Sequence, residues 1–245
     1  MKKNQVIVVG AGVAGLSAAL FTARADLSTM LINCGSSILN RNAHLENYPG
    51  FPDGIDPRLL LTMIEDQVES AGAGVDSSTV TKVTADEKFR VHAGGTVTET
   101  ERLILTSWSD LSPVEDLAVE QYKDGGKRFV RTDNRGETAV DGLYAAGRIA
   151  GTHHQTIVAA GDGARVGLNV IEDLKPDFYH DWVAPEGYFT DRGRDVPQGC
   201  EEISEDERMR RTRQGKQTLI DYLASSDTED PTPHPSQLDD TNEEC

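Results

Sequence analysis

Cysteine is scarce in this sequence of 245 residues. The three cysteines, Cys34, Cys200 and Cys245, lie far apart, and none belongs to a C-x-x-C pair. Such an odd and widely spaced set excludes a disulfide framework, zinc-ligand spacing and an adjacent redox dithiol. We therefore expect Cys34 to be a small buried residue at the end of a strand, and Cys200 and Cys245 to have no chemical role.

Basic residues are also few. The 24 Lys and Arg residues stand against 41 Asp and Glu residues, which gives a formal net charge of -17. This charge repels nucleic acid phosphates and anionic membrane surfaces, so we expect no nucleic acid partner. The acidity favours a halophilic, haloarchaeal source, because a salt-rich cytoplasm screens the self-repulsion of such a surface.

Long hydrophobic runs are nearly absent. Apart from residues 6–21, no run approaches the ~20 apolar residues of a membrane span. Together with Lys2, Lys3 and the small residues at 23–25, this stretch imitates a secretory signal peptide. Cleavage there would discard a glycine turn and strand that fit the rest of the chain. We therefore expect a cytoplasmic protein without a membrane partner, and the signal peptide stays the alternative.

That glycine turn is the most informative feature present. A β-branched run over residues 6–9 is followed by Gly10-x-Gly12-x-x-Gly15 and an alanine-rich segment. Gly10 permits a tight turn, Gly12 lets a pyrophosphate approach the backbone, and Gly15 lets the helix lie close to the sheet. Residues 6–33 therefore predict a β-α-β unit that binds a dinucleotide. Asn33 stands where a ribose-binding carboxylate is usual, and it offers an amide without charge.

The remaining pattern predicts an α/β protein with a Rossmann-like fold, in which a parallel central sheet and a small antiparallel sheet form three layers with the helices. We expect a helix over 57–71 capped by Asp56, and another over 155–174. Residues 109–124 are expected to be a polar connection with a short helix from Pro113, and residues 176–200 to be irregular. Ser204 and Glu207 resemble a capping box that opens a charged helix. Further strands are expected at 74–83, 89–93, 96–98, 102–105, 129–130 and 142–147.

Taken together, the motifs resemble the flavin domain of low-molecular-weight thioredoxin reductases. They are the first glycine turn, Glu-Asn-Tyr-Pro-Gly at 46–50, Arg-Thr-Asp at 131–133, Gly-Leu-Tyr-Ala-Ala-Gly at 142–147, and His-Gln-Thr at 154–156. The likeness covers about residues 4–174. It implies an FAD-binding domain over 1–174, followed by an extension over 175–224 with the charged helix and a disordered acidic tail over 225–245.

The resemblance also implies where an extended FAD would lie. The pyrophosphate would lie on the first glycine turn, the ribose near the end of the second strand, the ribityl chain at the second glycine turn, and the flavin pyrimidine edge at the start of the last helix. His154 is a candidate proton donor, or else an exposed loop histidine. The implied cofactor-binding residues are Gly10, Gly12, Ala14, Gly15, Asn33, Cys34, Asn47, Val83, Gly147, Arg148, His154, Gln155 and Thr156.

Several departures separate the sequence from that family. The junction at 107–124 is too short for the inserted NADPH domain with its redox C-x-x-C, so we expect both to be missing. An Ala-Thr-Gly motif has become Thr-Ser-Trp at 106–108, and the residues around Ile38 and Leu39 differ. Arg148 replaces an aspartate. It neutralises the FAD pyrophosphate, or it marks a decayed site where it pairs with a surface carboxylate.

Three functions remain open from the sequence. The first is an FAD-dependent oxidoreductase that takes electrons from an external donor or a partner protein. The second is a non-catalytic, flavin-dependent sensor or regulatory partner, and the third is NAD binding in the first half alone. No metal site is expected, and no catalytic residue is assigned. The family resemblance implies a possible homodimer.

Overall fold

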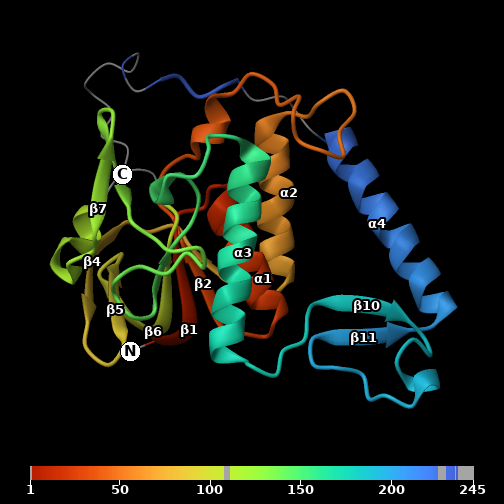
Figure 1. The fold of residues 1–245 in the computed structure, drawn as a ribbon. Helices are drawn as coiled ribbons and strands as arrows, with labels where there is room; N and C mark the ends of the chain where they lie inside the picture. The colour runs from red at the N-terminus through yellow and green to blue at the C-terminus, as the bar shows by residue number, and fades with distance from the viewer. Residues whose placement is uncertain (1, 108–110, 226–229, 235, 237–245) are drawn as a thin grey trace. The chain divides into compact units, whose positions relative to one another are not determined.

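The computed structural model describes residues 2–107, 111–225, 230–234 and 236 (Figure 1). The chain divides into two compact units, one of residues 1–170 with 229–245 and one of residues 171–228. Each unit is described by itself. Among the described residues, no helix combines the length and apolar character needed to cross a bilayer.

The first unit is built on the predicted β-α-β arrangement. Strand β1 (Lys2–Val9) leads through the glycine turn into helix α1 (Val13–Arg24), and the chain returns in β2 (Thr29–Ile32). Strand β1 pairs in parallel with β2 and with β6 (Thr96–Leu105), and β9 (Leu143–Ala145) pairs in parallel with β6. β3 (Gly74–Asp76) extends the sheet in parallel beyond β2. This parallel sheet confirms the predicted α/β fold.

An antiparallel portion continues from the same sheet. β5 (Phe89–Ala93) pairs with the first half of β6, and β4 (Val80–Ala85) pairs with β5. The two short strands predicted at 96–98 and 102–105 are one continuous strand, because β6 pairs with β1 over nearly its whole length. The strand predicted over 74–83 is divided between β3 and β4.

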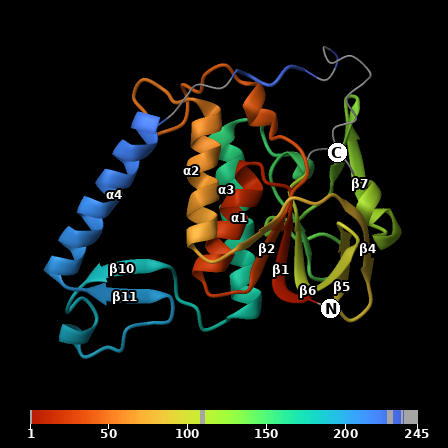
Figure 2. The same ribbon diagram turned by 180° about the vertical axis from the view of Figure 1, so that it is seen from behind.

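Different elements pack on the two sides of the parallel strands. Helices α1, α2 (Pro57–Ser70) and α3 (Thr156–Leu174) lie beside the parallel strands, and β4 and β5 lie toward the other side (Figures 1 and 2). Alternate residues of the parallel strands, among them Ile7, Val9 and Leu103, pack with Val91 and Phe89 of the antiparallel portion. Helix α2 begins as predicted, because the Asp56 side chain accepts hydrogen bonds from the N–H groups of Arg58 and Leu59.

Between β6 and β9 the chain forms small elements. A 3-10 helix η2 (Ser112–Leu117) agrees with the predicted short helix at Pro113. A hairpin of β7 (Gln121–Asp124) and β8 (Lys127–Val130) follows. The polar sequence of β7 carries no alternation, so the sequence did not predict it. Its Tyr122 ring lies 5.4 Å from that of Phe129 in β8.

The second unit is more regular than predicted. β10 (Trp182–Pro185) pairs in parallel with β11 (Cys200–Ile203), so the expectation of irregular structure over 176–200 was wrong. The loop between them contains η4 (Thr190–Arg192) and is fixed by Glu202, whose carboxylate accepts hydrogen bonds from the backbone of Gly187, Phe189 and Thr190. These contacts lie far apart in sequence, which is why no local pattern revealed them.

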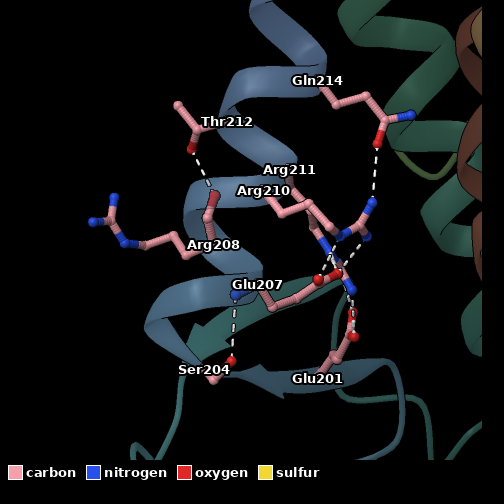
Figure 3. A network of polar contacts seen from close by, with 8 residues as sticks. All are labelled: Glu201, Ser204, Glu207, Arg208, Arg210, Arg211, Thr212 and Gln214. Carbon is pink, nitrogen blue, oxygen red and sulfur yellow. Dashed lines mark hydrogen bonds and ion pairs between the residues drawn. The ribbon is translucent and has the colours of Figure 1, made fainter.

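Helix α4 (Glu205–Ser225) ends this unit and begins where the sequence predicted. The Ser204 hydroxyl accepts a hydrogen bond from the Glu207 N–H over 3.3 Å. The Glu207 carboxylate does not return to the cap. It accepts hydrogen bonds from Arg210 and Arg211 instead, and Arg211 also pairs with Glu201 of β11 (Figure 3). Only half of the predicted capping box is therefore formed.

The expectation for Cys34 needs correction. Cys34 is half-buried rather than buried, because it lies past the end of β2, and it is disulfide-bonded. Cys200 is a free, half-buried thiol that donates to the carbonyl of His180. Cys245 and most of the predicted acidic tail lie outside the described residues. Within the described part of that tail, the Thr232 N–H donates to the Asn40 carbonyl over 3.0 Å.

Candidate functional site

One cleft joins the two regions that the sequence singled out. It has a volume of about 670 Å³ and lies within the first unit. The first glycine turn lines one part of it, and residues 154–156 at the start of α3 line another. Residues after β2, the 3-10 helix η1 (Ile38–Arg41), Asn47 and residues 78–80 complete the wall. The cleft is large enough for an extended small-molecule ligand.

The three glycines of the turn have different physical roles. Gly10 has φ +105°, and a Cβ there would lie 2.8 Å from the backbone nitrogen of Ser107. A Cβ at Gly15 would lie 1.9 Å from the carbonyl oxygen of Gly10. At Gly12 the nearest atom to such a Cβ is the Ser37 hydroxyl oxygen, 3.9 Å away. Packing therefore requires Gly10 and Gly15, whereas the absence of a side chain at Gly12 leaves open space in the cleft.

The N-terminus of α1 faces this cleft without a cap. Gly12 is the N-cap residue and supplies no side-chain hydrogen bond, and the first turn contains no acidic residue. The amides of a helix N-terminus and its dipole favour an anion at that position. Val13 and Ala14 also line the cleft, whereas Gly15 is buried behind it.

Asn33 braces the glycine turn. Its side-chain oxygen accepts a hydrogen bond from the Ala11 N–H over 3.0 Å, and its side-chain nitrogen donates to the Gly35 carbonyl over 3.0 Å. Asn33 and Cys34, the residues predicted to lie near a ribose, both line the cleft. The amide of Asn33 is nevertheless engaged with the protein, which leaves it less capacity for a ribose than a carboxylate would have.

At the far end of the cleft, a loop contacts the start of α3. The Asn47 side-chain nitrogen donates to the Gln155 side-chain oxygen over 2.8 Å. Thr156 begins α3, whose first turn has no acidic residue. The residues predicted to lie at the flavin are thus brought together, although 108 positions separate Asn47 and Gln155 in the sequence.

The second glycine turn lies against the first. Gly147 has φ +73°, and a Cβ there would lie 2.7 Å from the Cβ of Ala14. The Gly147 N–H donates to Asp162 over 2.7 Å. Gly147 does not line the cleft, but the next residue, Arg148, does. The turn therefore places the backbone that precedes Arg148 close to the beginning of α1.

Arg148 and His154 are neighbours in the cleft. The Arg148 Nη1 lies 3.2 Å and 3.0 Å from the two ring nitrogens of His154. Burial and the charges of Arg148 and Lys127 lower the pKa of His154 below its usual 6.5. Burial and the charge of Arg41 lower the pKa of Arg148. At neutral pH, His154 is therefore a neutral ring that can accept a hydrogen bond from Arg148.

Val83, like Gly15 and Gly147, is a predicted site residue that does not line the cleft. It is fully buried in the core, and Val80 lines the cleft instead. The register of β4 against β5 shifts between Val80 and Lys82, so these two valines, three residues apart, both face inward. A bulge of this kind leaves no mark in the alternation of the sequence.

Sequence reasoning missed two functional candidates in the cleft. The Thr106 hydroxyl donates toward the carbonyls of Val9 and Gly10, over 2.9 Å and 2.8 Å, and so fixes the end of β1. Arg41 of η1 also lines the cleft. The sequence did offer one signal for Arg41, because a basic residue shortly after the second strand is unusual in a chain with so few of them.

Comparisons with known proteins agree with this arrangement. Residues 4–107 match the family model of the pyridine nucleotide-disulphide oxidoreductases. A thioredoxin reductase of Rickettsia felis is 31% identical over 127 residues, which cover 50% of this chain and 41% of that protein. A thioredoxin reductase of Streptomyces clavuligerus is 36% identical over 112 residues, covering 43% and 34%. The chain thus spans well under half the length of these relatives.

Solved structures give the same fold. The thioredoxin reductase of Streptococcus pyogenes superposes with a TM-score of 0.65 at 15% identity, covering 71% of this chain and 99% of that one. A ferredoxin-flavin thioredoxin reductase of Clostridium acetobutylicum has a TM-score of 0.59 at 17% identity, covering 72% and 99%. The chain therefore has the Rossmann-like fold of the thioredoxin reductases, and residues 4–107 are similar in sequence to the pyridine nucleotide-disulphide oxidoreductases.

Proposed function

We propose that the first unit binds FAD in the cleft and that the protein is an oxidoreductase whose electrons come from an external donor. The observation that carries this proposal is the cleft that joins the uncapped α1 N-terminus to the start of α3. A dinucleotide cofactor needs a binding site of this extended kind. Gly12 supports it further, because the protein's own packing gives no reason for a glycine there.

The ends of the cleft suit different parts of FAD. The turn around Gly12 would hold the diphosphate through backbone amides. Gln155, Thr156 and the N-terminus of α3 would meet the pyrimidine edge of the flavin, where the helix dipole favours negative charge. FAD, when bound, supplies the transfer of electrons. Asn47 holds Gln155 in place through its 2.8 Å hydrogen bond.

His154 would act on Arg148 rather than on a substrate. Its lowered pKa keeps the ring neutral at neutral pH, and both of its nitrogens lie near the Arg148 guanidinium. A neutral ring accepts a hydrogen bond from arginine and repels it once protonated. We therefore propose His154 as a positioning residue and assign no proton donor.

The proposed external donor rests on the connection between β6 and β9. Among the described residues of this segment, the regular elements are η2, a short hairpin and turns, and none is a β-α-β unit. This arrangement supports the proposal that the NADPH domain of thioredoxin reductases is missing from this junction. One structural neighbour is described as a ferredoxin-flavin thioredoxin reductase, which favours a protein donor over a nicotinamide.

The test is a visible spectrum of the purified protein after incubation with FAD and removal of the unbound cofactor. We expect bound flavin that is reduced by light and reoxidised, and no reduction by NADPH alone. Gly12→Asp is the matched variant, since it places a carboxylate at the proposed diphosphate, and it should lose the flavin. A colourless wild-type protein would reject the proposal. Bound flavin that no protein donor reduces in turnover would favour the flavin-dependent sensor instead.

A further inference from the structure

The lining of the cleft has a charge opposite to that of the chain. Arg41 and Arg148 are its arginines, and no Asp, Glu or Lys stands among the described residues that line it. The chain as a whole carries 41 acidic residues and a formal net charge of -17. The described lining, with two guanidiniums and no carboxylate, therefore contrasts with the rest of the sequence, and this contrast fits an anionic ligand.

Arg148 is held beside the N-terminus of α1. The preceding residue, Gly147, packs so closely on Ala14 that a Cβ there would lie 2.7 Å from that of Ala14. The guanidinium is then steadied by the ring of His154, at 3.0 Å and 3.2 Å. The backbone before Arg148 thus packs against α1, and the Arg148 guanidinium lies in the cleft beside His154.

Arg41 is held by a second arginine that lies outside the cleft. Arg58 of α2 donates through Nη1 to the carbonyls of Asn40 and Asn42, over 3.1 Å and 2.9 Å, on either side of Arg41. The charge of Arg58 is balanced by Asp56, with which it forms an ion pair. The backbone on both sides of Arg41 is therefore held by hydrogen bonds, which fixes the point from which the Arg41 side chain extends.

The two cleft arginines carry like charges that interact unfavourably with each other. Burial, and after it the charge of Arg41, lowers the pKa of Arg148, and both arginines line the same cleft. An anion between them removes that repulsion and forms charge-assisted hydrogen bonds with both. Guanidinium suits this role because its fork of N–H donors matches phosphate oxygens.

We propose that Arg41 and Arg148 form a clamp for the diphosphate of the ligand, working with the amides at the start of α1. This inference deepens the proposed function and rests on it for the identity of FAD. It predicts that affinity resides in the diphosphate, so that a nucleoside diphosphate binds without any flavin. Arg148 would then determine specificity at the position where the sequence departs from the related family.

The experiment is calorimetric titration of the full chain with ADP and with adenosine, at one fixed salt concentration. We expect ADP to bind at least tenfold more tightly than adenosine. Arg148→Ala and Arg41→Ala should each weaken ADP about tenfold and leave adenosine unchanged, and Arg148→Lys should fall between. Arg90→Ala is the control, because it removes the same charge from β5, away from the cleft. Thermal unfolding checks that each variant is folded.

The outcomes separate this inference from the proposed function. ADP binding that depends on both arginines, with no FAD binding, would support the clamp and reject the flavin. FAD binding with unchanged ADP affinity in folded Arg41→Ala and Arg148→Ala would overturn the clamp and keep the flavin. A wild-type chain that does not bind ADP, or an equal loss in Arg90→Ala, would also overturn it.

Discussion

The side chains of Asn47 and Gln155 meet over 2.8 Å and join the loop before α2 to the start of α3. Both residues line the cleft. In the proposed function they stand at its flavin end, whereas the N-terminus of α1 stands at its diphosphate end. The bond holds Gln155 where the proposed flavin edge would lie. It is exposed, so its loss should affect the ligand more than the fold.

Asn47→Ala should therefore weaken FAD binding by about threefold to tenfold, which corresponds to one hydrogen bond of about 1 kcal/mol. ADP has no flavin end, so its affinity should stay the same. Fluorescence titration with FAD and calorimetry with ADP check the two values. Glu46→Ala, next in the chain and highly exposed, is the control. An equal loss of ADP and FAD affinity would contradict the assignment of this end of the cleft.

Substitutions at two glycines of the first turn should have different effects, one on ligand affinity and the other on the free energy of unfolding. Gly12→Ala adds a methyl group that projects into the cleft, so we expect weaker ADP and FAD binding with an unfolding free energy changed by less than ~1 kcal/mol. Gly15→Ala forces a methyl group against the Gly10 carbonyl and should cost ~1–3 kcal/mol or more. Denaturant unfolding and ligand titration of both variants check this. Similar stability losses in the two would show that Gly12 also serves packing.

Much of the fold could be predicted because its signals are local. The glycine turn, the Asp56 cap and the apolar spacing of α2 each lie within a few residues, and each predicted its element. The pairing of β10 with β11 could not be predicted in this way, because Glu202 fixes a loop that begins 15 residues before it. The bulge in β4 likewise appears only once β5 is placed beside it.

The candidate site shows the same division. Gly12, Gln155 and Asn47 were identified from motifs, and the structure brings all three to one cleft. The bracing role of Asn33 was not predictable, since its partner is a backbone N–H that depends on the turn's geometry. Arg41 was missed because its local signal, a cation shortly after the second strand, does not reveal that Arg58 fixes the carbonyls on both sides of it.

Helix α4 should respond to acid through Glu207. Hydrogen bonds from Arg210 and Arg211 lower the pKa of this carboxyl from 4.5 to about 2 (Figure 3). The folded state thus binds fewer protons at Glu207 than the unfolded state does. The contribution of the Glu207 carboxylate to stability is therefore complete above pH 4.5 and is lost as the pH falls toward 2. Amide exchange over α4, corrected for intrinsic rates, should show protection that declines in this window.

Glu207→Gln should show reduced protection of α4 already at neutral pH and a smaller further loss below pH 4.5 than the wild type, because, of the carboxylates of Glu205 and Glu207, only that of Glu205, whose pKa is lowered by Arg208, still titrates there. Asp206→Asn, at the adjacent exposed position of the same first turn, is the control and should keep the wild-type profile. If the Glu207→Gln profile followed that of the wild type across this window, the arginine contacts of Glu207 would not stabilise the helix.

Two glycines of α3 offer a matched pair for the packing that supports the cleft. A Cβ at Gly163 would lie 1.9 Å from the carbonyl oxygen of Ala14, which is backbone of α1 and cannot move aside locally. Gly163→Ala should therefore push the helices apart, cost ~1–3 kcal/mol and weaken ADP binding, because Ala14 belongs to the proposed diphosphate site.

Gly161, the matched control in the same helix, has no atom within 4 Å of the same added carbon. Gly161→Ala should raise stability by ~0.5–1 kcal/mol, since alanine is the better helix former. Chemical denaturation of both variants measures the contrast, and a Gly163→Ala protein as stable as Gly161→Ala would mean that α1 and α3 are not in backbone contact at this point.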